Sequence, residues 1–162
     1  MAAWDSISVR KYGEAIDRCA RGLENDPQYP LLRLWLGVAY EQESRFEDAI
    51  REMEAALQVL GVSPLAMGAL GHAHALTGNQ AEAKRLLQEL QKLHERGLGD
   101  PYASALIYAG LGERDQAFEW LNNAADSRAS WLTTLIKSDP RMDALRPDLR
   151  FQNILRRMGL YS

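Results

Sequence analysis

The sequence predicts an all-α protein built from a repeated helix-turn-helix unit. One alanine recurs at a constant spacing of 34 residues, without insertion or deletion, at Ala15, Ala49, Ala83 and Ala117. Small or apolar residues follow each alanine at intervals of four and seven residues, which places them on the same helical face every time. Glycine and proline mark the turns between these helical stretches, at Pro27, Gly61, Gly78 and Gly112. A fixed period of this length is typical of helices that stack into a solenoid.

The first unit, residues 1–29, is predicted to be a partial repeat. Counting back from Ala15 leaves Met1 in the middle of a first helix, and the second helix closes near Pro27. A solenoid end that lacks a cap exposes apolar surface. We therefore expect the chain to be a piece of a longer protein.

Two full repeats are predicted next, at residues 30–63 and 64–97. Each consists of a helix of about a dozen residues, a turn and a second such helix, so that neighbouring units bury the faces that one helix alone would expose. Gly71 is predicted to lie where the two helices of its own unit touch, because small residues let helix axes approach to roughly 8 to 10 Å. Leucine at Gly71 should therefore be destabilising, whereas Gly99 should tolerate leucine in its predicted loop.

Residues 98–131 are predicted to form the last repeat, and residues 132–162 a capping segment. The stretch "SWLTTLIK" could start a fifth unit, but Pro140 stops what would be its first helix. Asp139 then begins a short helical turn that ends before Pro147. An amphipathic capping helix is predicted to follow, because apolar residues recur at helical spacing at Phe151, Ile154, Leu155 and Met158.

The stretch "LWLGVAY" at 34–40 resembles the tetratricopeptide repeat, whose 34-residue signature is W-x2-L-G-x2-Y, then A-x3-F, then a closing proline. The signature tryptophan position instead holds Arg33, Met67 and Pro101. The resemblance covers residues 12–159. It implies one domain over residues 1–162, a right-handed superhelix (α-solenoid) of about three and a half repeats with a C-terminal capping helix.

The C-terminal run "SDPRMDALRPDLRFQNILRRMGL" also resembles the ending of tetratricopeptide regions in large bacterial signalling proteins. In those proteins the repeats follow a serine/threonine kinase, a nucleotide cyclase or a winged-helix DNA-binding domain. This second resemblance implies that the chain is a regulatory part of a larger bacterial protein.

Composition argues against a membrane protein and against a fold held by disulfides or zinc. No apolar run at the start of the chain suggests a secretory signal, so we expect a cytoplasmic protein. Residues 55–81 contain no Asp, Glu, Lys or Arg, but Gly61 and Pro64 interrupt the segment and its polar side chains would be costly in lipid. Cys19 is the only cysteine and can form neither an internal disulfide nor a zinc site on its own.

The sequence predicts neither an enzyme nor a protein that needs a cofactor. It contains no glycine-rich phosphate loop. His72 and His74 lie two residues apart on one helix and point in different directions, so we expect no shared metal, and His74 is predicted to pack in the core. Only Glu41 and His72 could form a polar site in a groove, which is a weak basis for catalysis. The net charge of −3 and the lack of a basic stripe argue against nucleic-acid binding.

Binding of another protein is the function that remains. The resemblance implies that the first helix of each unit lines a concave face and that mostly apolar or small residues would contact a ligand there. These residues lack the lysine, arginine and asparagine with which relatives hold acidic chaperone tails. The predicted groove for a peptide, helix or neighbouring domain is formed by Leu34, Val38, Glu41, Gly68, His72, Tyr102 and Leu106.

Two alternatives to a groove that binds a foreign ligand stay open. The groove residues could simply pack against one another in a tight superhelix. The same surface, or the N-terminal end, could also serve self-association into a homodimer. An apolar concave surface larger than a few hundred Å² usually has a partner, which favours binding.

Overall fold

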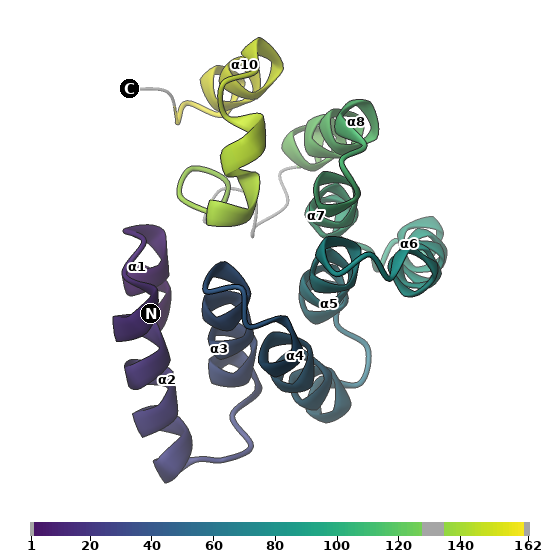
Figure 1. Cartoon of the computed structure of the whole chain (residues 1–162). Helices are drawn as coiled ribbons and strands as arrows, with labels where there is room; N and C mark the ends of the chain where they lie inside the picture. Colours follow the sequence, from purple (N-terminus) through teal and green to yellow (C-terminus); the bar gives the residue numbers. More distant parts are fainter. Residues whose placement is uncertain (1, 128–134, 161–162) are drawn as a thin grey trace.

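The computed structural model describes residues 2–127 and 135–160, and these residues form helices and connecting turns with no strand among them (Figure 1). Consecutive helices pack against each other along the chain. The end of the predicted repeat 98–131 and the start of the predicted segment 132–162 lie outside the described residues. The helices are α1 (Ala2–Ser8), α2 (Tyr12–Asn25), α3 (Pro30–Gln42), α4 (Phe46–Leu60), α5 (Pro64–Leu76), α6 (Gln80–Glu95), α7 (Pro101–Leu111), α8 (Arg114–Asp126), the 3₁₀ helix η1 (Pro140–Leu145) and α10 (Leu149–Arg157).

The predicted 34-residue period is visible in the backbone. The second helices of the units, α2, α4, α6 and α8, begin at the same interval, at Tyr12, Phe46, Gln80 and Arg114. The turn before each of them contains a residue with positive φ, and these residues are also 34 apart, at Arg10, Ser44, Gly78 and Gly112. The four recurring alanines are fully buried. The all-helical, repeat-like architecture expected from the sequence is therefore confirmed.

The first helices of the units form the interior of the stack. Figure 1 shows α5 enclosed by α3, α4, α6 and α7. Every residue of α5 from Ala66 to Ala75 is buried. This position explains the central part of the uncharged stretch 55–81, because a charged side chain between Ala66 and Ala75 would be taken out of water. No helix among the described residues has both the length and the apolar character needed to cross a membrane.

In the fourth unit the start of the first helix departs from the regular spacing, although the second helix keeps it. Pro30 and Pro64 begin α3 and α5 at an interval of 34 residues, but α7 begins later than this interval predicts, at Pro101. Helix α6 extends to Glu95, and the side chain of Asp100 accepts a hydrogen bond from the Tyr102 N–H and so caps α7. The first helix of the last unit is therefore shorter than its counterparts.

Glycines on α5 permit a close crossing with α7. A Cβ atom at Gly68 would lie 2.8 Å from the backbone Cα of Ala103, and one at Gly71 would lie 2.3 Å from Cδ1 of Ile107. The atoms nearest to Gly71 therefore belong to the first helix of the next unit, and not to the second helix of its own unit as predicted. The predicted tolerance of Gly99 is also wrong, because a Cβ there would lie 2.7 Å from the backbone Cα of His94.

The C-terminal helix α10 packs against α8 at the end of the stack. Arg150 binds Asp115 at 2.7 Å and stacks over the Phe118 ring at 4.2 Å, and Arg157 pairs with Asp126. Phe151 and Ile154 are buried as the amphipathic pattern predicts. The preceding 3₁₀ helix η1 takes a different course and turns back toward α7 and the α1–α2 turn (Figure 1).

Candidate functional site

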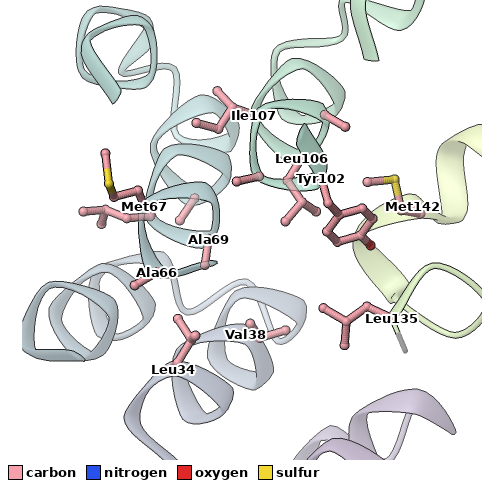
Figure 2. Close-up of a cluster of buried hydrophobic side chains, with 14 of the residues drawn as sticks. Leu34, Val38, Ala66, Met67, Ala69, Tyr102, Leu106, Ile107, Leu135 and Met142 are labelled. Carbon is pink, nitrogen blue, oxygen red and sulfur yellow. The ribbon is translucent and has the colours of Figure 1, made fainter. Parts of the chain in front are cut away.

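The residues of the predicted groove lie together on α3, α5 and α7, and none of them faces open solvent. Figure 2 shows Leu34, Val38, Tyr102 and Leu106 in one cluster with Leu135 and Met142 from the C-terminal part of the chain. Leu34, Val38 and Leu106 have no exposed surface. All seven predicted groove residues are buried: Leu34, Val38, Glu41, Gly68, His72, Tyr102 and Leu106.

The chain's own residues 135–146, here called the covering segment, occupy this part of the concave face. The segment contains η1 and packs against α7. Most of its apolar and two of its polar side chains are buried: Leu135, Ile136, Asp139, Pro140, Arg141, Met142 and Leu145. Val38 and Leu106 therefore contribute to an internal core and not to an open groove.

A buried ion pair lies at the centre of the covering segment. Arg141 donates through Nε and Nη2 to the carboxylate of Asp139 at 2.9 and 2.8 Å, and the Tyr102 hydroxyl donates to Asp139 Oδ2 at 2.7 Å. Burial would raise the pKa of Asp139, but the charge of Arg141 and these hydrogen bonds hold the pKa below its ordinary value. Burial, reinforced by Asp139, raises the pKa of Tyr102 well above its ordinary value. The tyrosine therefore stays protonated and acts as a hydrogen-bond donor.

Glu41 and His72, the two polar residues predicted in the groove, are brought together by the fold. Nδ1 of His72 lies 2.8 Å from Oε1 of Glu41, and Gln42 donates to Oε2 of Glu41 at 3.1 Å. The side chains of Glu41 and His72 are 0 % and 5 % exposed. The pair joins α3 to α5 beneath the surface, so a substrate would have to displace other residues to reach it.

Arg10 holds the edge of the covering segment. It donates to both carboxylate oxygens of Asp143, at 2.6 and 3.2 Å, and to the backbone carbonyl of Ser138 at 2.6 Å. Arg10 has a φ of 64°, a conformation that is unfavourable for a residue with a side chain. These hydrogen bonds connect the α1–α2 turn to the C-terminal part of the chain.

An open apolar pocket of about 390 Å³ borders the predicted groove, since Leu34 lines both. Leu31 and Leu65 occupy equivalent positions, 34 residues apart, one helical turn before Leu34 and Gly68. The predicted groove residues on α3 and α5 begin at Leu34 and Gly68. Extending the prediction by one helical turn toward the N-terminal ends of these helices would have included both leucines. The pocket lies between the N-terminal ends of α3, α5 and α7 and is lined by Pro30, Leu31, Leu34, Leu60, Ser63, Pro64, Leu65 and Asp100.

The polar groups of this pocket have structural roles. The Ser63 side chain accepts a hydrogen bond from the Ala66 N–H and caps α5, as Asp100 caps α7. Burial raises the pKa of Asp100, while its hydrogen bond from the Tyr102 N–H opposes the shift. The surface left for a ligand is therefore mainly hydrocarbon.

The described residues offer neither a reactive cysteine nor a cluster of metal ligands. The Cys19 thiol is buried, which raises its pKa to about 12 and keeps it protonated. No group of three or more His, Cys, Asp and Glu side chains within residues 2–127 and 135–160 is placed to hold a metal ion.

Comparison of the chain with protein-family models gave no match, and neither did comparison with curated proteins.

Proposed function

We propose that the protein is a tetratricopeptide-like interaction module that binds an apolar segment of a partner protein in the pocket between α3, α5 and α7. The single observation that carries the proposal is this apolar pocket, lined by Leu31, Leu34 and Leu65, beside the concave face. Leu60 at its rim is 42 % exposed, so the apolar lining continues onto the surface. The C-terminal run favours a regulatory role within a larger cytoplasmic bacterial protein.

The size of the pocket suits one or two large side chains of a partner. Each fully buried Leu, Ile, Phe or Met side chain contributes about 1.5 to 3 kcal/mol. The partner we expect is therefore a short helix or extended peptide that presents large apolar residues on one face. Such a small contact is sufficient for weak, reversible binding rather than for a permanent complex.

Selection from a random peptide library with the immobilised protein tests this proposal for ligands of any sequence. We expect the selected peptides to share large apolar residues. Leu65→Arg should weaken their binding at least about tenfold, because the guanidinium would lie in the apolar pocket. Affinities are measured by fluorescence anisotropy with labelled peptides.

Leu149→Arg is the matched control for this experiment. Leu149 is 70 % exposed at the start of α10, outside the pocket, so its replacement should leave peptide affinity unchanged. If no apolar peptides are selected, or if both arginine variants bind them as the unchanged protein does, the pocket is not the binding site.

Self-association is the second candidate function. Val62, in the turn beside the pocket residues Leu60 and Ser63, is 71 % exposed and could pack against the same patch of a second copy in a two-fold dimer. Sedimentation velocity over a concentration series distinguishes the two candidates. A dimer that Leu65→Arg dissociates would replace the peptide hypothesis, whereas a monomer at all concentrations would remove the dimer.

A further inference from the structure

We propose that the covering segment is a releasable occupant of the concave face, and that a partner segment with the same chemistry takes its place. This proposal concerns the inner face beneath residues 135–146 and not the open pocket. The partner would carry an acidic residue, a basic residue two positions later and a large apolar residue next. These are the roles of Asp139, Arg141 and Met142.

The fit of the covering segment is incomplete at its centre. Nη1 of Arg141 is buried and has no hydrogen-bond partner among the described residues, although the other two guanidinium nitrogens bind Asp139. A buried donor without an acceptor opposes docking, and a buried ion pair recovers its desolvation cost only when its hydrogen bonds are complete. Both features weaken the hold of the segment relative to an apolar contact of the same size.

The contacts at the edge of the segment are also weak. Asp143 and Arg10 are 46 % and 36 % exposed in their ion pair, where solvent and salt screen the attraction. Tyr102 supplies the buried hydrogen bond from α7 to Asp139. Arg10 and Arg114 also donate to the backbone carbonyls of Ser138 and Ala144, at 2.6 and 3.1 Å, and both of these hydrogen bonds are exposed. Release of the segment would therefore give up apolar packing, one buried hydrogen bond and several solvent-exposed polar contacts.

The segment is pre-organised by hydrogen bonds within itself. Arg146 donates to the carbonyls of Lys137 and Asp139 at 2.8 and 2.7 Å, and Asp139 Oδ1 accepts from the Arg141 N–H at 3.0 Å. Both partners of each of these hydrogen bonds lie within the segment, so a peptide with this sequence carries all the groups that form the turn. Pre-organisation lowers the entropy cost of binding, so the turn is suited to act as a ligand in trans.

The face beneath the segment would keep its own structure after release. The hydrogen bond between Glu41 and His72 joins α3 to α5 and involves no residue of the segment. Glu41 also attracts Arg141, which adds to the effect of Asp139 in raising the pKa of the arginine. The exposed face would thus present the Tyr102 hydroxyl for an acidic group, and Val38 and Leu106 for an apolar side chain.

A competition experiment with the full-length chain tests the proposal. The probe is a fluorescent synthetic peptide of residues 135–147. Met142→Ala weakens the occupant but leaves the face unchanged, since Met142 belongs to the segment and is fully buried. We expect the peptide to bind this variant at least about tenfold more tightly than the unchanged protein.

Met53→Ala is the matched control, because Met53 is an equally buried methionine on α4 and not in the segment. It should destabilise the stack without increasing affinity for the peptide. Equal binding by all three proteins, or no binding by any, would show that the covering segment is a fixed part of the core. Leu65→Arg changes the open pocket alone. It therefore distinguishes a failure of the pocket proposal from a failure of the proposal that the covering segment is released.

Hydrogen exchange of the unchanged protein provides a second test if Met142→Ala does not fold. The amides of Met142 and Arg146 are hydrogen-bonded to residues three positions earlier. We expect them to exchange at least about tenfold faster than the interior amides of α5, through local release of the segment. Exchange at the same rate as α5 would overturn the proposal.

Discussion

Gly68→Leu is expected to lower the unfolding free energy by about 3 kcal/mol and the melting temperature by roughly 6 to 12 °C. Leucine should stabilise the helix by somewhat less than 1 kcal/mol relative to glycine if only local propensity mattered. At Gly68, however, the first side-chain carbon would lie 2.8 Å from Cα of Ala103 and 3.1 Å from its carbonyl oxygen. These are backbone atoms, so α5 and α7 would have to separate. Circular dichroism during thermal unfolding measures the shift.

Gly13→Leu is the control, because Gly13 also lies in a helix but a Cβ there meets no other atom within 4 Å. Its melting temperature should rise slightly or stay the same. Gly71→Leu should be intermediate, since the clash there is with the side chain of Ile107. Equal melting temperatures for Gly68→Leu and Gly13→Leu would contradict the close crossing of α5 and α7.

Asp139→Ala is expected to destabilise the docking of the covering segment by about 3 to 5 kcal/mol. The change leaves the guanidinium of Arg141 buried without its carboxylate and the Tyr102 hydroxyl without its acceptor. The segment should therefore detach while α3 to α8 stay folded. Limited trypsin digestion followed by mass spectrometry should show rapid cleavage after Arg141, whose side chain is only 1 % exposed in the intact fold.

Asp143→Ala is the matched control, because this nearby carboxylate is 46 % exposed in its pairs with Arg10 and Arg146. Its loss should cost about 1 kcal/mol or less. The same rate of cleavage after Arg141 in both variants would show that the buried Asp139 pair does not hold the segment.

Acid should have a related effect on the unchanged protein. The pKa of Asp139 is lower in the folded chain than its ordinary value of about 3.9. The stability that this carboxylate contributes is therefore fully present above about pH 4 and is lost as the pH falls through the lower folded pKa. The Asp139→Ala variant should lack this part of the acid sensitivity.

The repeat can be predicted well from the sequence because it arises from packing between helices that are close together in the chain. The buried alanines and the helix starts at Tyr12, Phe46, Gln80 and Arg114 depend on contacts between neighbouring units. Each unit meets the same geometric requirement, so the same residue sizes recur. The 34-residue spacing does not predict the later start of α7, although Asp100 before Pro101 is a helix-start signal that the sequence contains.

The residues that the sequence predicts for a groove lie together on α3, α5 and α7, but they are buried, and the segment that covers them does not follow from the sequence pattern. It predicts a cap for residues 132–162, and α10 with Phe151 and Ile154 has that position on α8. The position of η1 depends on two contacts, between Asp139 and Tyr102 and between Arg10 and Asp143. The residues of each pair are far apart in the chain, and the 34-residue period does not relate them. Glu41 and His72 are likewise predicted to be open groove residues, and their pairing across two helices does not follow from one helical pattern.

Methyl NMR of protein labelled at the methionine ε-carbons tests the central claim, that the chain covers its own concave face, most directly. The sequence contains five methionines, so the Met142 signal can be assigned by comparison with Met142→Ala. Met142 lies beside Tyr102 in the buried cluster (Figure 2). We expect nuclear Overhauser effects between the Met142 methyl and the Tyr102 ring in the unchanged protein. A Met142 methyl with an unfolded chemical shift and no such effects, in a chain whose α3 to α8 are folded, would contradict this claim.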